Sequence, residues 1–172
     1  MKVILTILLI ILVSGCKTTD TPIAAPVEIL NDKDNDIERI NQACAGQVFS
    51  RIELPNNSVG SLVAIAENAE ACLRDTHFSA THPDNQLAMQ LQAIVVKSYF
   101  KAGDIRSAKI AFTQFRTKFP MQDLVYDDFT SFVDTTTALL QYKQLTSLQL
   151  ERLNINPVLK AELARQQRWA LQ

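Results

Sequence analysis

The side chains best suited to chemistry in this 172-residue chain are three cysteine thiols, Cys16, Cys44 and Cys72. A thiol can act as a nucleophile, a metal ligand, an acylation site or one half of a disulfide, and its surroundings decide which. A zinc site is disfavoured because the sequence has no CxxC or HxxxH spacing, and its two histidines, His77 and His82, lie in a stretch typical of a loop. We therefore expect no metal and no cofactor.

Residue patterns typical of enzymes do not accompany these thiols. The sequence contains no GxSxG, HExxH or Walker motif and no glycine-rich phosphate loop. The adjacent carboxylates Asp127 and Asp128 could serve acid–base chemistry, but no histidine or glycine loop lies near them in the chain. A solvated helix start is the favoured interpretation of this pair. We expect that the protein is not an enzyme.

The segment before Cys16 has the features of an export signal. Lys2 gives it a positive start, and residues 3–13 are apolar apart from Thr6. A helix of that length would span about 16 Å, roughly half of a bilayer core. This is too short for a stable transmembrane helix, and it suits the apolar region of a cleaved signal.

Ser14 and Gly15, directly before Cys16, resemble the lipobox of bacterial lipoproteins. The resemblance implies that residues 1–15 are a signal peptide and that Cys16 carries acyl chains such as palmitate. Each buried methylene contributes about 0.8 kcal/mol, so three chains would make release from the membrane negligible. Lys17 stands where an aspartate would favour the inner membrane, which implies the periplasmic face of the outer membrane. The alternative is an ordinary cleaved signal followed by a chance cysteine.

Export also bears on the two remaining cysteines, Cys44 and Cys72. The periplasm is oxidising, and an even pair of thiols is expected to form a disulfide there. Two antiparallel helices joined by a short loop would bring these residues toward each other. Two buried thiols that act as small apolar side chains are the alternative.

Composition and apolar spacing predict an all-α body over residues 36–172. Residues 16–35 are rich in Thr, Pro and Asp without an apolar period, so we expect a flexible tether there. The formal net charge of −1 does not favour nucleic acid as a partner. The helices expected from apolar spacing, caps and breakers are 36–49, a second with Leu62, Ala66, Ala69 and Leu73 on one face, a third from Asp84 or Asn85 to Gly103, a fourth from Asp104 to Pro120, and a last one opened by Asn156 and Pro157. The cap of the second helix is expected at Asn57 or Ser58.

Five residues in the middle of the chain have the spacing of the tetratricopeptide signature: Tyr99, Gly103, Ala108, Phe112 and Pro120. The resemblance to the tetratricopeptide repeat implies a 34-residue pair of antiparallel helices from about Met89 to Gln122. Its neighbours match poorly, and a shift by one repeat predicts a further helix over 123–141. We expect antiparallel helical hairpins that form a short tetratricopeptide-like solenoid with flanking capping helices. A generic helical hairpin is the alternative.

In tetratricopeptide folds the first helices of successive pairs line a concave groove. Matching position implies that this groove contains Gln90, Ala93, Lys97, Phe100, Lys101, Leu124, Asp127, Ser131 and Asp134. Because Lys97 and Lys101 are one helical turn apart, we hypothesise that they bind an acidic or carboxylate-bearing peptide. Solvated lysines with weak neighbour pairing are the alternative interpretation.

These patterns predict a lipid-anchored periplasmic adaptor or assembly factor for an envelope machine, a role implied by likeness to repeat-bearing lipoproteins. Its expected partners are the membrane, through Cys16, and an unknown envelope protein. The alternatives are a carrier of an apolar ligand, an enzyme that acts on an envelope polymer, and a structural subunit of a larger assembly. Trp169 is favoured to pack on the body, with a role as a partner anchor as the alternative.

Overall fold

Seven helices make up the part of the chain that the computed structural model describes, residues 37–74 and 77–170. They are α1 (Gln42–Ile52), α2 (Val59–Cys72), α3 (Asn85–Lys101), α4 (Ile105–Lys118), α5 (Phe132–Gln141), α6 (Ser147–Arg152) and α7 (Pro157–Ala170). No strand occurs in the described residues, so the all-α prediction is confirmed. The predictions for residues 1–36, namely the signal peptide, acylation of Cys16 and the tether, lie outside this part.

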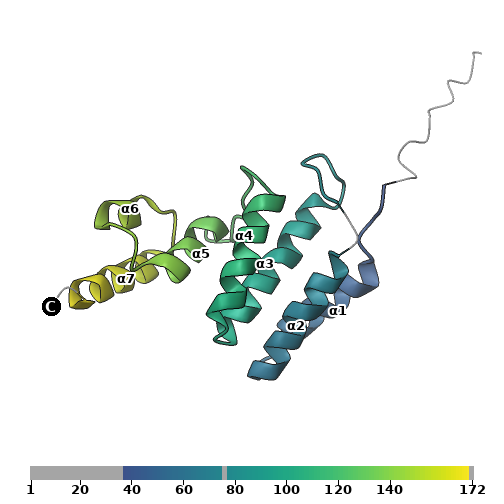
Figure 1. Ribbon diagram of the computed structural model, residues 1–172, viewed down its shortest axis with the longest axis horizontal. Coiled ribbons are helices and arrows are strands. Elements are labelled where there is room, and N and C mark those ends of the chain that lie inside the picture. Colours follow the sequence, from purple (N-terminus) through teal and green to yellow (C-terminus); the bar gives the residue numbers. More distant parts are fainter. Residues whose placement is uncertain (1–36, 75–76, 171–172) are drawn as a thin grey trace, which may run out of the picture. The chain divides into compact units, whose positions relative to one another are not determined.

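Helices α1 to α4 pack in chain order, each against the next, as antiparallel neighbours (Figure 1). One apolar core runs through them, and its largest fully buried members include Ile65, Met89, Leu91 and Phe115. A second, smaller cluster joins α5 to α6 and α7. Helices α1 to α4 therefore share the main core, and α5 belongs to both clusters, because its Phe132 and Leu140 lie in the main core and its Ala138 lies in the smaller one.

The helix boundaries that depend on local caps agree with the sequence. The Ser58 side chain caps α2 by accepting a hydrogen bond from the Ser61 backbone N–H at 3.2 Å, and Asp104 caps α4 through Ser107 at 3.0 Å. Gly103 ends α3 with φ of 82°, a left-handed conformation that glycine adopts without steric cost. Such boundaries are predictable because donor and acceptor lie within a few residues of each other.

The first helix begins at Gln42 rather than near residue 36. Asn41 caps it by accepting the Cys44 backbone N–H at 3.0 Å. Ile40 belongs to the core, but its N–H donates to the Asp84 carboxylate at 2.9 Å instead of continuing a helix. The prediction failed here because an apolar period does not distinguish helix from an extended segment held by a distant side chain.

The predicted helix over 123–141 is wrong in its first half, because α5 starts only at Phe132. Residues 123–131 form a loop that an isolated antiparallel bridge between Val125 and Ser131 closes. The Asp123 carboxylate accepts the Val133 N–H at 3.0 Å, and Ser131 caps α5. Short polar side chains of this kind bind the local backbone and compete with helix formation.

Trp169 does not pack on the body as the sequence favoured, since 65% of its surface is exposed near the end of α7. The one buried residue of α7 is Leu163, in the middle of the helix. The indole therefore contributes little to the core of the described residues.

Cys44 on α1 and Cys72 at the end of α2 are joined by a disulfide, with Cα atoms 5.8 Å apart. The pairing agrees with the prediction from cysteine number and export. The bridge links residues separated by 28 positions in the sequence, at the open end of the α1–α2 hairpin. It therefore fixes the two helices where no connecting loop holds them.

Replacement of both cysteines by alanine should lower the free energy of unfolding by about 3 to 4 kcal/mol, because the closed loop no longer limits the unfolded chain. Urea unfolding at neutral pH measures the change. A reductant should shift the wild-type midpoint in the same direction and leave the double variant unmoved. Equal midpoints for wild type and double variant would show that the bridge does not stabilise the fold.

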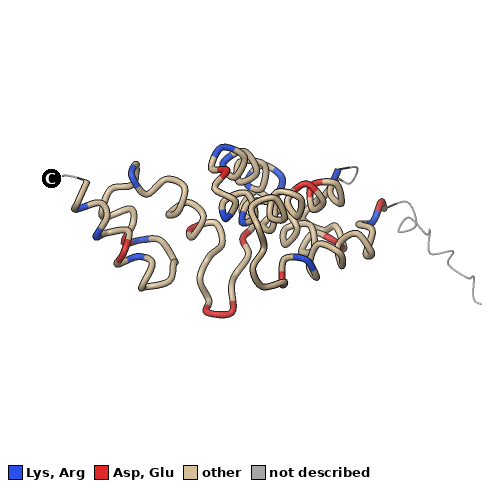
Figure 2. The backbone as a smooth tube through the Cα atoms, turned by 90° about the horizontal axis from the view of Figure 1, so that it is seen from below, with Lys and Arg blue, Asp and Glu red and all other residues tan. Residues whose placement is uncertain are grey.

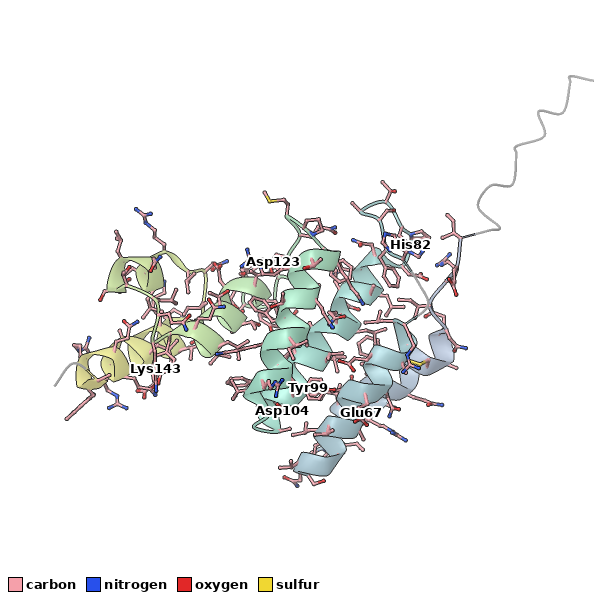
Figure 3. All side chains as sticks on the ribbon, in the orientation of Figure 1. Glu67, His82, Tyr99, Asp104, Asp123 and Lys143 are labelled. Carbon is pink, nitrogen blue, oxygen red and sulfur yellow. A yellow bond between two sulfur atoms is a disulfide. The ribbon has the colours of Figure 1, made fainter. Side chains whose placement is uncertain are left out.

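Asp84 precedes α3 but does not cap it with its side chain. The buried carboxylate accepts hydrogen bonds from Arg39 Nε at 2.8 Å, Arg39 Nη2 at 2.6 Å and the Ile40 N–H. The hydrogen bonds from Arg39 hold the pKa of the Asp84 carboxyl below its ordinary value, against the opposing effect of burial. Beside it, His82 accepts the Asp84 N–H through Nδ1 at 3.0 Å, and its Nε2 lies 3.1 Å from the Glu38 carbonyl oxygen. The loop that contains His82 is thus a clamp on the segment before α1 (Figure 3).

An Asp84→Asn variant should unfold at lower urea concentration at pH 7, with a loss of about 1 to 3 kcal/mol. The pKa of Asp84 is lowered in the folded state, so its contribution is present above the ordinary pKa and is lost as pH falls through the folded value. The difference between wild type and variant should therefore shrink below about pH 4. Asp127→Asn, in an exposed position, is the matched control and should show neither effect. A difference for Asp84→Asn that is constant from pH 7 to pH 3 would contradict this assignment.

Candidate functional site

Four residues of α3 are exposed, and all four lie on one stripe of the helix: Gln86, Gln90, Lys97 and Lys101. The rest of α3 is covered by its neighbours, and nine of its residues are buried. The spacing of the four matches a single helical face. This stripe is the open face of α3, and two pockets lie along it.

The first of these, the α1–α3 pocket, has a volume of about 330 Å³. Its lining combines two residues of α1, five of α3 and three of the loop before α5. These residues are Phe49, Ile52, Gln86, Gln90, Ala93, Ile94, Lys97, Leu124, Val125 and Tyr126. The walls are mostly apolar, and the two glutamines supply amide groups.

The second, the α3–α5 pocket, has a volume of about 270 Å³. Its lining residues come from α3, the same loop and α5: Val96, Lys97, Phe100, Lys101, Tyr126, Thr135, Thr136, Leu139 and Leu140. The Thr135 Oγ1 atom is buried and has no hydrogen-bond partner among the described residues. We use the name docking groove for the two pockets together.

Lys97 and Tyr126 line both pockets and divide one from the other. The Lys97 ammonium lies 5.4 Å from the centroid of the Tyr126 ring, within the range of a cation–π interaction. This contact joins the exposed face of α3 to the loop at 123–131. It gives the groove a polar centre between two apolar halves.

The charged side chains that line the groove are all positive. Neither pocket lining contains an aspartate or glutamate, whereas both contain Lys97 and one also contains Lys101. Loss of surrounding water lowers the pKa of the Lys97 ammonium, and the charge of Lys101 lowers it further. A carboxylate placed at this position would favour the charged ammonium and so oppose both effects.

Of the predicted partner-binding residues, the structure brings together Gln90, Lys97, Phe100 and Lys101 on this groove. Ala93 and Leu124, implied by the same repeat matching, also line it. The residues carried by α3 thus share one surface, as the repeat resemblance implied. This half of the site could be identified because a helical period determines which side chains lie together.

The other predicted positions, Asp127, Ser131 and Asp134, do not line the docking groove. The Ser131 hydroxyl donates to Asp123 and accepts the Asp134 N–H, and Asp134 accepts the Asn154 N–H at 2.7 Å. Asp127 is exposed in the loop at 123–131, and Figure 2 shows acidic positions in red at the tip of a long loop. The assignment of Asp127 and Ser131 depended on a helix over 123–131 that the structure does not have, whereas Asp134 lies in α5 but its carboxylate binds the Asn154 backbone.

Sequence reasoning missed Tyr126, Thr135 and Leu139, together with the α1 residues Phe49 and Ile52. The loop geometry that positions Tyr126 depends on Asp123, whose role as an acceptor for α5 is not visible in an apolar period. The available signal was the presence of aromatic and aliphatic residues shortly after a helix that carries two outward-facing lysines. The α1 pair could have been found from the expected antiparallel packing of the first helices.

The described residues contain no candidate metal site, since no group of three or more His, Cys, Asp or Glu side chains among them could hold a metal ion. Within residues 37–74 and 77–170 no helix combines the length and apolar character needed to cross a membrane. No protein-family model matches the chain, and neither a curated protein nor a solved structure matches it.

The Tyr126 phenol should titrate at unusually high pH. Burial raises the pKa of Tyr126 to about 12, and the charges of Asp123 and Asp128 add to the effect. The folded state favours the neutral phenol, and the stability that this contributes is fully present below the ordinary tyrosine pKa of about 10. It is lost as pH rises through the pKa of Tyr126 in the folded state. Titration of tyrosinate absorbance should therefore lose its highest step in Tyr126→Phe.

Tyr99→Phe is the control for this titration, and it should leave the highest step in place. Circular dichroism at each pH establishes that the protein is still folded. A highest step that survives Tyr126→Phe would show that the ring beside Lys97 is not the shielded phenol.

Proposed function

We propose that this protein is a lipid-anchored periplasmic adaptor or assembly factor that binds a segment of an envelope protein in the docking groove. The observation that carries the proposal is the single open face of α3, where two lysines stand among apolar walls that contain no acidic residue. Such a face offers apolar contact and positive charge to an incoming chain. It offers no nucleophile–base pair or metal site for catalysis.

Several contacts support a tetratricopeptide-like arrangement of α3 and α4. Ala108 is fully buried where the two helices approach, and Phe112 packs edge-on to Phe132, with ring centroids 6.2 Å apart. Tyr99 reaches toward α2 and lies 3.5 Å from a Glu70 carboxylate oxygen. In this arrangement α1, α3 and α5 are the first helices of successive pairs, and these are the helices that line the docking groove.

The proposed place of action is the periplasmic face of the outer membrane. The supporting features are the short apolar segment before Ser14-Gly15-Cys16, Lys17 after it, and the Cys44–Cys72 bridge, which suits an oxidising compartment. In the proposed mechanism acyl chains on Cys16 localise the protein and the docking groove holds the partner. The protein acts by bringing molecules together and performs no reaction.

A photo-crosslinking amino acid placed in living cells tests this proposal. At Gln90 or Leu139, on the two halves of the docking groove, it should give an adduct of one defined mass after irradiation. At Lys109, an exposed α4 residue outside both pocket linings, it should give none. The adduct should fractionate with the outer membrane and should carry label from a palmitate analogue.

Three variants make this experiment decisive. Lys97→Glu with Lys101→Glu should abolish the adduct formed at Gln90, whereas Lys109→Glu should leave it unchanged. Cys16→Ser should remove the palmitate label and release the protein from the membrane. Equal adducts from groove and control positions would refute the docking role, and an unlabelled protein that still fractionates with the membrane would refute the anchor.

A further inference from the structure

The docking groove has a two-part construction that restricts what it can bind. Each half is apolar, and the Lys97–Tyr126 contact separates the halves. Pockets that enclose a whole small molecule commonly have volumes of about 300 to 1,000 Å³. The volume of about 330 Å³ lies at the lower end of that range and the volume of about 270 Å³ lies below it, so each pocket suits a bulky side chain better than a complete ligand.

From this construction we infer that the partner segment is an extended peptide with two large apolar side chains, three positions apart, and an acidic residue between them. The inference rests on the proposed function and specifies the class of partner that the groove takes. The two apolar side chains would occupy the α1–α3 and α3–α5 pockets. The acidic residue between them points away from the pocket-facing side of the peptide, and its side chain would reach the rim of the groove, where Lys97 and Lys101 are exposed one helical turn apart.

The spacing follows from the geometry of α3. The α1–α3 pocket uses α3 positions from Gln86 to Lys97, and the α3–α5 pocket uses positions from Val96 to Lys101. The centres of these two stretches are roughly 10 Å apart at 1.5 Å per residue. A polyproline II segment advances about 3.1 Å per residue and returns a side chain to the same face every third residue, so positions i and i+3 match this distance.

The charge requirement follows from the lining. Lys97 has lost part of its water and has no carboxylate near it in either pocket, so an acidic side chain is the group that it binds best. At the α3–α5 end the peptide would meet mostly apolar side chains, such as Phe100 and Leu139. Gln86 and Gln90 offer amides at the other end of the groove.

An acyl chain fits this surface less well than a peptide. A fatty acid would require one continuous apolar cavity, but the Lys97–Tyr126 contact interrupts the apolar surface at its middle. Two separate apolar halves with a cation between them match separate side chains on a peptide backbone better than one unbroken hydrocarbon chain. Binding of a fatty acid is therefore one of the outcomes that the test distinguishes.

The test measures fluorescence anisotropy of capped, labelled octapeptides with full-length protein purified in detergent. The reference peptide has leucine at i and i+3, glutamate between them, and glycine and serine elsewhere. Glutamate replaced by glutamine should weaken binding by roughly tenfold, the loss of one charge-assisted contact. Replacement of either leucine by alanine should also cost roughly tenfold, since each side chain loses its burial.

A charge exchange separates specificity from misfolding. Lys97→Glu should lose the reference peptide and gain a peptide with lysine in place of its glutamate. Gln90→Trp, on the exposed edge of the α1–α3 pocket, should weaken binding of the reference peptide, whereas Lys109→Glu should not. Thermal unfolding of each variant establishes that the fold is retained.

Three results would overturn the inference: equal affinity for all peptides, binding only of a helical peptide with leucines at i and i+7, or binding of decanoate without binding of any peptide. The proposed function fails separately. Groove-specific adducts in cells with no affinity for the octapeptides would leave the adaptor role standing and reject this peptide class. Octapeptide binding without adducts in cells would reject the adaptor role.

Discussion

Burial of α3 is the constraint on which the rest of the described structure depends. This helix packs against α1, α2 and α4, and its covered faces supply much of the main core. A helix that is apolar on most sides must be enclosed by neighbours to be stable in water. Because the neighbours cover all but one stripe, the same packing that stabilises the fold defines the surface where a partner can approach. Fold and candidate site thus have a common cause.

The polar residues on that stripe keep the neighbouring elements from covering it. Lys97 and Lys101 carry charges that are costly to bury without a partner, and Gln86 and Gln90 carry amides with the same requirement to a smaller degree. An apolar residue at Lys97 would favour closer packing of the loop at 123–131 onto α3. The lysine instead meets the Tyr126 ring face, a contact that leaves its ammonium able to bind an anion. The groove is therefore preserved by side chains that resist closure.

Local chemistry explains which parts of this fold were predictable from the sequence. Ser58, Gly103 and Asp104 mark helix ends through contacts within a few residues, so their roles could be identified from the chain alone. Asp84 resembled a helix cap in sequence, but its carboxylate binds Arg39, 45 residues earlier. Gln92 stands where an apolar residue would be expected, yet it is buried and donates to the Ala111 carbonyl oxygen at 3.2 Å. Long-range partners of this kind have no signature in an apolar period.

The candidate site also has one half that depends on local helical spacing and one half that depends on long-range contacts, and the two halves need not respond alike when the fold is loosened. Its α3 half was predictable from helical spacing, whereas the half that contains Tyr126 depends on how Asp123 and Ser131 fold the loop before α5. The α1–α3 pocket also borrows Phe49 and Ile52 from a helix held by the disulfide and by the clamp at Asp84. The α3–α5 pocket contains no α1 residue and does not need those restraints. Loosening α1 would therefore affect one half of the docking groove and spare the other, so affinity and stability need not change together.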